Sequence, residues 1–458
     1  MFERFEILEE TLSRLLSERN YAAAKAVLAT MNPGDIAAMF GHMKERSVTL
    51  LFRLLPKDVA AETFAEMDPE DQEFLIEGFS DNELKEVLEG LSDDDAAALA
   101  EEMPASVVKR LLRQADPQMR RAINQLLRYP ENSAGSIMTT EYVSLRPDMT
   151  VGESILRIRR QGVDKETIYT CYVTENRVLV GVVTVRELLL CGDDETLVRD
   201  IMLTNVLSVS TVTDQEEASQ LLSRYNFLAL PVVDGENRLV GIVTFDDAMD
   251  VLEEAATEDM ELMGGMTPSE KTYLRSSPFE LFKNRVPWLM LLMVSATFTG
   301  LIITAFEGAL AAQVALTAFI PMLMGTGGNS GSQSSVTVIR ALSLGELRLG
   351  DVWHIIGKEL CTAALCGLAL GAVCFGKIWL VDRLLMGNTD ITWQVDAVVC
   401  LTLAVTVVAA KLVGCTLPLG AKALKLDPAV MASPFISTIV DALSLLVYFF
   451  FARSILGV

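Results

Sequence analysis

Histidine is almost absent from this chain, with only His42 and His354 among 458 residues. No glycine-rich phosphate-binding loop with its lysine occurs either. The seven cysteines are scattered, mostly in apolar segments, and none belongs to a Cys-x-x-Cys pair. These absences argue against an enzyme and against a zinc or copper site, because both need clustered nucleophiles, histidines or cysteines. We expect the thiols to be buried and reduced.

The first part of the chain is strongly acidic and is expected to stay in the cytoplasm. Residues 286–458 hold nine basic and nine acidic residues, so residues 1–285 carry the entire net charge of −23. The N-terminal MFERFEILEE is charged and lacks the apolar run of a cleavable signal peptide. An acidic surface argues against nucleic acid as a partner and favours cations. The chain therefore divides into a soluble acidic part and an apolar membrane domain.

Residues 1–130 are predicted to form an all-helical domain. Apolar residues recur there at intervals of three and four, and a short motif recurs loosely. Its copies are NPGDIAAMF (32–40), LPKDVAAETF (55–64) and LSDDDAAALA (91–100). Each begins with a turn or capping residue and continues with an acid and small residues. Such a repeat predicts stacked helical hairpins in a superhelix, and an irregular bundle is an equally good interpretation.

Residues 131–255 contain a duplication. Ser136-Ile137-Met138 and Asp200-Ile201-Met202 open the two copies, and GVVT (181–184) corresponds to GIVT (241–244). Each copy is predicted to contain a strand, a helix, two apolar strands joined by a polar turn, and a final helix. The whole pattern resembles a tandem cystathionine β-synthase-type (CBS) pair, which implies an α/β regulatory module that often binds adenine nucleotides.

Arg186 and Glu187 follow the first GVVT and are candidate contacts to a nucleotide such as ATP. A simpler interpretation is that both are surface residues at the start of a helix, and this interpretation is favoured.

Residues 246–261 are expected to form an acidic helix, and an amphipathic connecting segment over 256–285 leads to the membrane. Eight carboxylates occur there without one basic residue: Asp246, Asp247, Asp250, Glu253, Glu254, Glu258, Asp259 and Glu261. Several fall on one helical face at steps of three and four, where like charges destabilise a helix. A divalent cation between this face and another acidic surface would relieve the repulsion. We therefore favour a cation sensor over a solvated acidic face.

Five apolar segments follow, near 286–306, 310–339, 352–381, 396–418 and 429–452. All four tryptophans fall near predicted segment ends, as aromatic belts require. If the N-terminus is cytoplasmic, most loop Lys and Arg residues lie inside, as expected for a membrane protein. Five spans then place the C-terminus outside the cell (inner) membrane.

The second apolar segment contains a polar stretch, PMLMGTGGNSGSQSSVTVIR (321–340). We expect it to break the helix and to face protein or water, because exposed backbone polar groups are costly in lipid. Gly328, Asn329 and Gln333 would provide close backbone approach and neutral oxygens at the inner mouth of an ion pathway. Tight packing alone explains the glycines but not the two amides.

Asp441 is the candidate ion ligand of the last segment, where Ser433, Pro434 and Ser437 precede it. A charged carboxylate within a spanning helix is costly unless it meets water, a cation or a partner. Pro434 removes a backbone donor and is expected to free carbonyls in the preceding turn. We place Lys411 near a segment end, so we expect no basic partner at mid-membrane depth. A pore carboxylate is therefore favoured over a buried acid bonded to a neighbouring helix.

Glu307 lies in the outer turn after the first apolar segment. It either attracts cations to an entrance or is an exposed turn residue, and the sequence does not separate the two. Neutral oxygens with few carboxylates suit a hard cation, and Mg²⁺ retains most of its water ligands. The pattern therefore favours Mg²⁺, while Ca²⁺, Mn²⁺ and Co²⁺ are not excluded.

The order of these parts is similar to that of the MgtE family of magnesium channels. YPENSAGSIMT (129–139), GTGGNSGSQSS (325–335) and DPAVMASPFISTIVDALSLLVY (427–448) carry the resemblance, which covers essentially the whole chain. It implies a homodimer with its pore on the twofold axis and Asp441 of both subunits facing the ion. It also implies cytosolic Mg²⁺ sites between the CBS pair, the N domain and the connecting helix. By motif match these fall on Asp94, Asp214, Glu216, Asp246, Asp247, Asp250, Glu258 and Asp259.

The sequence thus predicts a multidomain protein with an all-α helical-repeat N domain (1–130), an α/β tandem CBS pair (131–255), an amphipathic connecting helix (256–285) and a five-helix transmembrane domain (286–458). We expect a homodimeric Mg²⁺ channel, in contact with membrane lipid, that cytosolic Mg²⁺ closes. The alternatives are a CBS-regulated transporter of another divalent cation such as Co²⁺ or Mn²⁺, and a membrane-anchored sensor that transports nothing.

Overall fold

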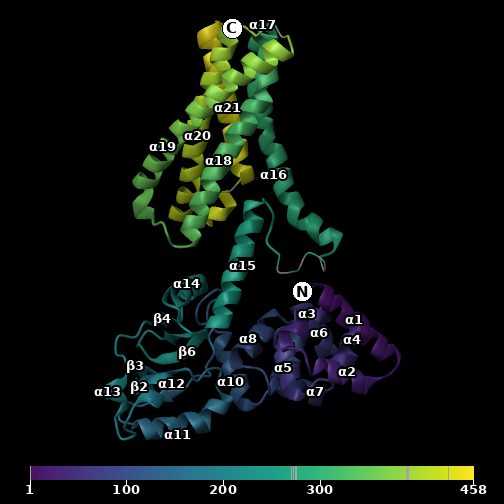
Figure 1. The fold of residues 1–458 in the computed structure, drawn as a ribbon, viewed down its shortest axis with the longest axis vertical. Helices are drawn as coiled ribbons and strands as arrows, with labels where there is room; N and C mark the ends of the chain where they lie inside the picture. The colour runs from purple at the N-terminus through teal and green to yellow at the C-terminus, as the bar shows by residue number, and fades with distance from the viewer. Residues whose placement is uncertain are drawn as a thin grey trace. The chain divides into compact units, whose positions relative to one another are not determined.

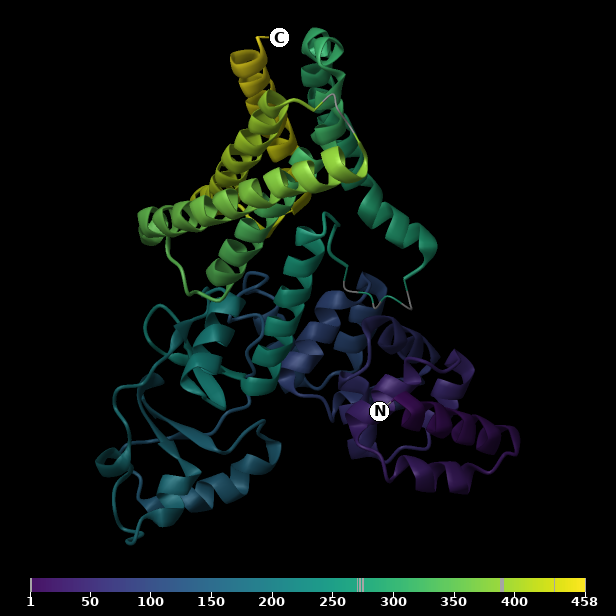
Figure 2. The same cartoon turned by 45° about the horizontal axis from the view of Figure 1, so that its top comes forward.

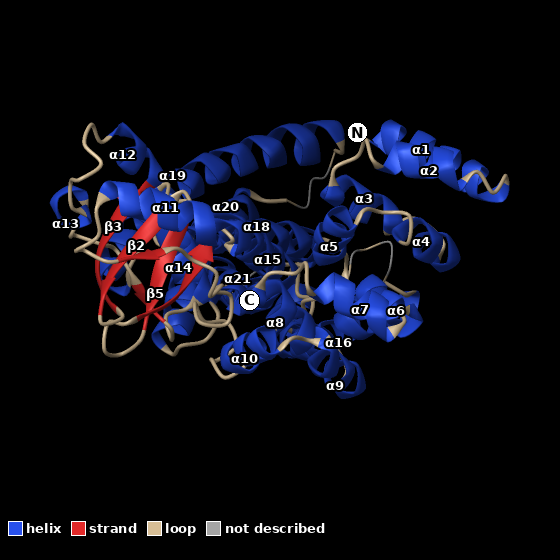
Figure 3. Cartoon of the chain, turned by 90° about the horizontal axis from the view of Figure 1, so that it is seen from below, coloured by secondary structure: helices blue, strands red, loops and turns tan. Residues whose placement is uncertain are grey.

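The computed structural model describes residues 2–269, 271, 273, 276–387, 391–431 and 433–457. The chain divides into two compact units, Met1–Leu252 and Glu253–Val458. The strands of the described residues all belong to the first unit, and the described part of the second unit is helical. Figure 3 shows these strands gathered in one part of an otherwise helical chain.

Ten short helices form the N-terminal part of the first unit. They are α1 (Phe2–Ser17), α2 (Tyr21–Leu28), α3 (Pro33–Phe40), α4 (Glu45–Phe52), α5 (Lys57–Ala65), α6 (Pro69–Gly78), α7 (Asp81–Leu88), α8 (Asp93–Glu102), α9 (Ala105–Gln114) and α10 (Pro117–Leu126). Helices two apart in the chain pack together, with α3 on α5, α5 on α7 and α7 on α9. This is the arrangement of a stacked repeat, and it favours the predicted superhelix over an irregular bundle.

The helix starts of this domain follow a twelve-residue period. The residues that precede α2 to α10 are Asn20, Asn32, Lys44, Pro56, Asp68, Ser80, Ser92, Pro104 and Asp116. Each repeat therefore contains a helix of two to three turns and a short connection. Such helices are marginal alone, so their stability comes from the apolar face that each buries in a common core.

Two three-stranded sheets form the rest of the first unit. The first contains β1 (Ser144–Leu145), β2 (Thr170–Glu175) and β3 (Val178–Thr184), and the second contains β4 (Val209–Ser210), β5 (Ala229–Val233) and β6 (Leu239–Thr244). In both, the first two strands are parallel and the last two antiparallel. The helices of this region are α11 (Val151–Gln161), α12 (Val185–Leu190), α13 (Val198–Ile201) and α14 (Gln215–Tyr225), with a 3-10 turn at Gly162–Asp164.

The strand register confirms the duplication. Val173 pairs with Gly181 in the first copy, and Val232 pairs with Gly241 in the second. The opening segment of each copy pairs with the sheet of the other copy. Thr139 of the first copy bridges Ile242 of the second sheet, and Leu203 of the second copy bridges Val182 of the first sheet. Each Ile-Met motif therefore packs against the glycine of the other copy.

Helix α15 (Phe245–Met263) begins directly after β6 and crosses from the first unit into the second without a break. The predicted connecting segment, 256–285, contains the end of α15 and the first turns of α16 (Pro278–Ala305). The predicted domain boundaries remain predictions.

The second unit is a bundle built around α18 (Ile320–Ser343). Its other helices are α16, α17 (Glu307–Ala312), α19 (Val352–Lys377), a π-helix (Ile378–Leu385), α20 (Trp393–Ala423) and α21 (Ser433–Leu456), with 3-10 turns at Val314–Phe319, Leu349–Asp351 and Pro428–Met431. Helix α18 packs on both α20 and α21, α19 packs on α20, and α16 packs on α21 (Figures 1 and 2). Tyr448 and Phe449 lie in the largest apolar cluster of this unit.

Several helices of the second unit are long and apolar enough to cross a membrane, so the chain has a multi-pass membrane domain. Four described spans meet both conditions, namely Pro278–Ala305, Leu349–Leu385, Trp393–Ala423 and Pro428–Leu456. Helix α18 is long enough, but its glycines, serines and amides make it too polar to be counted with them. The apolar helices alone therefore do not confirm the predicted number of five spans.

The prediction that the glycine stretch breaks its segment is wrong. Helix α18 continues from Ile320 to Ser343 through all four glycines. The reason is close packing: a Cβ built on Gly414 of α20 would lie 2.2 Å from the backbone oxygen of Gly331. A Cβ on Gly327 would lie 2.8 Å from Ser444 Oγ of α21. The glycines thus permit contact between backbones, while hydrogen bonds within the helix satisfy their polar groups.

Candidate ion pathway and regulatory site

Asp441 lies in the third turn of α21, an otherwise largely apolar helix, and it is half-buried. Among the described residues it has no hydrogen-bond or ion-pair partner. An unpartnered carboxylate within a spanning helix is unfavourable in hydrocarbon, so this group requires water or a cation. This agrees with a pore carboxylate and not with an acid bonded to a neighbouring helix.

The contacts between α18 and α21 place Asp441 beside the glycine stretch. A Cβ on Gly328 would lie 3.3 Å from Ser437 Oγ, and one on Gly331 would lie 2.8 Å from a methyl group of Ile436. The two helices run in opposite directions, so the next turn of α21, with Asp441, lies opposite the turn of α18 that holds Gly325. A Cβ on Gly325 would meet nothing within 4 Å. The turn of α18 opposite Asp441 therefore has open space beside Gly325.

Asn329 and Gln333 lie on a different face of α18 from the packed glycines. Both are exposed in the single chain, whereas Gly327, Gly328 and Gly331 are buried. The structure brings Gly328 and Ser437 together but leaves the two amides free to face another surface. Glu307, the first residue of α17, is also exposed, as both interpretations of it required.

The first two residues of α21 are Ser433 and Pro434. Pro434 was expected to free backbone carbonyls, but the helix begins at Ser433, so Pro434 lies in its first turn, where no interior hydrogen bond is lost. Thr438 Oγ1 donates to the Pro434 carbonyl oxygen at 3.1 Å. The side chain of Ser433 lies outside the described residues, and its predicted role stays a prediction.

The prediction that Lys411 lies near a segment end is wrong, because α20 continues to Ala423. Lys411 is only 6% exposed, within the bundle. Glu359 of α19 is a second charged residue inside a predicted span, and it accepts a hydrogen bond from Ser334 Oγ at 2.6 Å. In the described part of the chain, neither Lys411 nor any other base forms an ion pair with Asp441.

The end of α15 packs against two segments. One is the C-terminal end of α18, after the glycine stretch, and the other is the 3-10 turn that precedes α21. Asp259 accepts a hydrogen bond from Ser343 Oγ at 2.8 Å, and Leu262 packs with Ile339 and Ala429. Burial, and then the nearby Asp427, raise the pKa values of Glu258 and Asp259. Two carboxylates of the acidic helix therefore lie close to a third.

A second group of carboxylates lies within the first unit, and we call it the acidic cluster. It contains Asp94 and Asp95 of α8, Glu141 and Glu166 of two loops, and Asp246 and Asp247 of α15. Asp94 is 9% exposed, and its Oδ1 has no hydrogen-bond partner among the described groups. The N domain, the CBS pair and α15 all contribute acids to one place.

Several carboxyls of the acidic cluster are poorly solvated, and this changes their charge. Burial, and then repulsion from Asp94, raise the pKa of Asp247 to about 8, against a hydrogen bond from Thr244 that lowers it. Burial likewise raises the pKa of Asp94 to about 6, and those of Glu141 and the more exposed Glu166 to about 7. Near neutral pH these carboxyls therefore gain stability from protons or from a cation.

The donor set fits a hydrated hard cation. In the described residues, no three acidic, cysteine or histidine side chains are arranged to hold a metal ion directly. Mg²⁺ commonly keeps several waters and uses one or two carboxylates. The orphaned Asp94 oxygen and its repelling neighbours thus suit Mg²⁺ with its water shell better than a dehydrated ion.

Other predicted regulatory residues lie elsewhere. Asp214 caps α14, accepting hydrogen bonds from the backbone nitrogens of Glu216 and Glu217 at 2.9 and 3.3 Å. Asp250 lies close to Glu66 and helps to raise the pKa of that carboxyl, after burial. Glu253 and Glu254 are exposed and belong to the second unit.

Glu187 takes part in a capping box at the start of α12. Its carboxylate accepts hydrogen bonds from Thr184 N at 2.8 Å and Thr184 Oγ1 at 2.9 Å, while Arg186 is exposed. This geometry agrees with the favoured interpretation of both residues as the surface of a helix start.

Sequence reasoning missed Glu141, Glu166, Asp95 and Glu66. Glu141 and Glu166 lie in loops with no periodic pattern, and only the fold brings them to α15. A weak signal was available at Asp95, which follows Asp93 and Asp94 in the first turn of α8.

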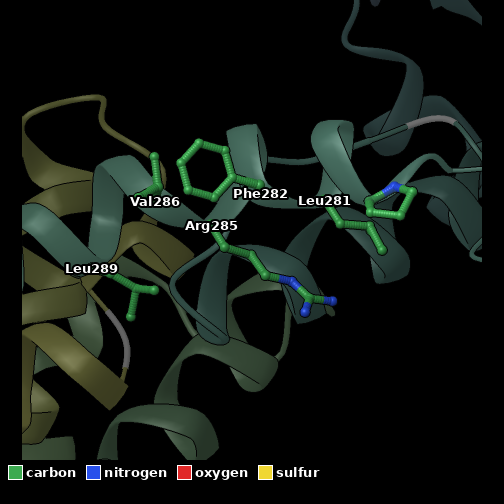
Figure 4. A pocket seen from close by; sticks show the side chains of 6 residues that line it. Leu281, Phe282, Arg285, Val286 and Leu289 are labelled. Carbon is green, nitrogen blue, oxygen red and sulfur yellow. The ribbon is translucent and has the colours of Figure 1, made fainter.

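The first turns of α16 carry a shallow pocket lined by Pro278, Leu281, Phe282, Arg285, Val286 and Leu289. Figure 4 shows the Arg285 side chain extending past its apolar neighbours. This mixture agrees with the amphipathic character predicted before the first span. None of the predicted pore residues lines it.

Comparisons with known proteins match different parts of the chain to different domain families. Residues 320–451 match a divalent cation transporter domain, 31–132 match the MgtE intracellular N domain, and 134–192 and 198–254 match CBS domains. The magnesium transporter MgtE of Thermus thermophilus is 39% identical over 457 residues, covering 98% of this chain and 99% of the relative. That of Bacillus subtilis is 34% identical over 440 residues, covering 95% and 94%. A crystal structure of the cytosolic domain of the Mg²⁺ channel MgtE in complex with ATP is 40% identical, with a TM-score of 0.51, and covers 53% of this chain and 99% of that one.

Proposed function

Because the chain belongs to the MgtE family of divalent cation transporters, we propose that it is a Mg²⁺-selective channel closed by high cytosolic Mg²⁺. The observation that carries the proposal is Asp441, a half-buried carboxylate in a spanning helix with no partner among the described residues. Ser437, one turn before it on α21, lies against Gly328 of α18. Mg²⁺ is the transported ion in this proposal.

Two copies of the chain form the pore in this proposal. The exposed amides of Asn329 and Gln333 lie on a face of α18 that no helix of the described chain covers. A twofold axis near this face would bring two Asp441 carboxylates together. One carboxylate from each subunit, with neutral oxygens around it, suits an ion that retains its waters. Glu307 would lie at the outer entrance.

The charges of the loops support the orientation in this proposal. We place α18 among five spans, because its polar face is covered by protein in the dimer and does not meet lipid. Lys and Arg residues then gather on the cytoplasmic side of an inner membrane, and the C-terminus lies outside.

Gating arises from repulsion between carboxylates. At low Mg²⁺, the ionised acidic cluster repels itself and loosens the contacts around Asp247 and Asp94. Hydrated Mg²⁺ neutralises the cluster, and α15, which ends beside Ser343 and Ile339, holds the inner ends of the pore helices closed. The strength of this effect equals the difference in Mg²⁺ affinity between the two states.

Single-channel recording with varied cytosolic Mg²⁺ tests the proposal. Wild-type current should fall as cytosolic Mg²⁺ rises, and Asp441→Ala should remove the current at every concentration. Glu346→Gln is the matched control, because Glu346 is an exposed acid in the loop after α18. Unchanged Mg²⁺ current in Asp441→Ala would contradict the pore assignment.

Two alternatives are separated by flux measurements. A transporter of Co²⁺ or Mn²⁺ would show uptake into liposomes that excess Mg²⁺ does not inhibit. A sensor without transport would show no flux of any divalent cation. The unpartnered Asp441 argues against the sensor, because a purely structural helix has no need of that charge.

ATP binding by the CBS pair is a separate proposal, supported by the relative that was crystallised with ATP. Calorimetric titration of ATP into the full chain tests it. Arg186→Ala should weaken binding if the exposed guanidinium meets a phosphate, and equal affinity would exclude Arg186 from the site.

A further inference from the structure

Two cysteines lie at the same level of the crossing between the third and fourth long helices of the membrane domain, α19 and α20. Cys374 lies near the end of α19, and Cys400 lies at the start of the third turn of α20. Both belong to the same apolar cluster, and both are free thiols. Cys374 is buried within this cluster, and Cys400 is partly buried and packs against it.

The packing of the two helices explains why the thiols meet. Helices α19 and α20 run in opposite directions and approach closely at two glycines. A Cβ on Gly367 would lie 2.9 Å from the Ala404 oxygen, and one on Gly371 would lie 3.7 Å from the Cys400 oxygen. Cys374 is one turn beyond Gly371, and Cys400 is one turn before Ala404. The small residues therefore bring the backbones close enough for the next pair of side chains to touch.

We propose that Cys374 and Cys400 are a site of reversible oxidation, at which a disulfide joins α19 to α20. A disulfide needs short distances between the two backbones and side chains that point toward each other. The close helix crossing supplies the first condition, and the burial of Cys374 in the cluster against which Cys400 packs supports the second. A metal site is disfavoured, because no third acidic, cysteine or histidine ligand joins them among the described residues.

The two thiols have different roles in the reaction. Cys400 is partly exposed and Cys374 is buried, so Cys400 reacts first. Its thiolate attacks one sulfur of a small disulfide oxidant, which releases one thiol and leaves a mixed disulfide on Cys400. Cys374 then loses its proton, attacks the Cys400 sulfur and releases the second thiol. Two electrons and two protons pass from the protein thiols to the oxidant.

Charged side chains lie at the ends of α19 and α20 that are near Cys374 and Cys400. Lys377 Nζ lies 2.8 Å from Asp382 Oδ2, and Arg383 lies 3.7 Å from Asp396, one turn before Cys400. In the proposed orientation, on which this step rests, this end faces the outside, where oxidising conditions favour disulfides. The oxidation itself does not depend on Mg²⁺ transport.

The test uses the full chain in membrane vesicles treated with oxidised glutathione. After denaturation, free thiols are counted with a maleimide and peptides are mapped by mass spectrometry. Wild type should lose two of its seven thiols and yield one linked peptide pair containing Cys374 and Cys400. Seven remaining thiols, or a bond between other cysteines, would overturn the proposal.

Three variants sharpen the result. Cys374→Ser should stop at a single glutathione adduct on Cys400, because the second thiol is missing. Cys366→Ser is the matched control, since Cys366 lies on the same helix as Cys374 and is partly exposed like Cys400, and this variant should still lose two thiols. Cys400→Ser should leave Cys374 unmodified over the same time, and rapid modification of Cys374 would contradict the order of attack. Linked Cys374 and Cys400 in vesicles without Mg²⁺ flux would support this site and contradict the proposed function.

Discussion

Replacing Asp247 by asparagine tests the idea that the acidic cluster opposes its own packing. Raising the pKa of this carboxyl from 3.8 to about 8 corresponds to a cost on the order of 5 kcal/mol for ionising it in the folded unit. Asparagine keeps an oxygen for the hydrogen bond from Thr244 but carries no charge. Because neighbouring carboxyls relax around the change, we expect a net gain of about 1–3 kcal/mol in the free energy of unfolding at pH 8 without Mg²⁺.

Thermal unfolding of the full chain in detergent measures this effect. For a unit of this size, each kcal/mol raises the melting temperature by about 2–4 °C. Mg²⁺ should stabilise wild type more than Asp247→Asn, because the variant has less charge to neutralise. Glu131→Gln is the control, since Glu131 is an exposed acid outside the acidic cluster.

One result would refute the reasoning. If Asp247→Asn melts at a lower temperature than wild type in Mg²⁺-free buffer, the carboxylate is satisfied in the folded state and does not repel its neighbours. An unchanged response to Mg²⁺ would separately exclude Asp247 from the regulatory site.

Three further outcomes are expected. Without Mg²⁺, the melting temperature of wild type should fall from pH 6 to pH 8, because acids with raised pKa values stabilise the fold when protonated and lose that contribution as they ionise; a rise would contradict the pKa directions. Gly414→Ala should lower the free energy of unfolding by about 1–3 kcal/mol, because the added methyl group overpacks against Gly331. Gly325→Ala has open space and should change the free energy of unfolding little or raise it, by at most about 1 kcal/mol. Equal melting temperatures of these two variants would exclude the close contact between Gly414 and Gly331. Leu262→Ala should weaken docking of α15 and leave a measurable current at high cytosolic Mg²⁺, and complete closure in patch recordings would show that this contact does not hold the gate.

The helical N domain could be predicted in kind but not in period. Sequence reasoning found only three copies of the motif, because the residue that precedes each helix varies among asparagine, lysine, proline, aspartate and serine. The period is carried by burial instead. Buried residues recur every twelve positions at Ala24, Ile36, Val48, Ala60, Gln72, Leu84 and Ala96. All of these residues except Gln72 are apolar, so a search for apolar residues at a fixed interval of twelve would have detected the repeat.

The CBS pair was predictable because its strands repeat as whole patterns, and the aligned valines and glycines occupy matching places in both sheets. The acidic cluster was predictable only in part. Asp246 and Asp247 belong to a run of acids that the sequence displays, but Glu141 and Glu166 come from loops far away in the chain. Their pKa values rise through burial, and burial is a property of the assembled unit.

The glycine stretch illustrates why the membrane domain was harder to predict. Glycines with polar neighbours suit both a broken helix and a tightly packed one, and the choice depends on residues elsewhere. Gly414 of α20 and Ser444 of α21 make the second possible, because their small side chains admit the backbone of α18 at Gly331 and Gly327. Once that face is covered, the amides at Asn329 and Gln333 cannot serve the same contact, since they lie on the exposed side of the helix. The two residue types therefore have different roles in α18. The glycines pack it against the other helices of the same chain, and the amides lie on the surface that a second copy would cover.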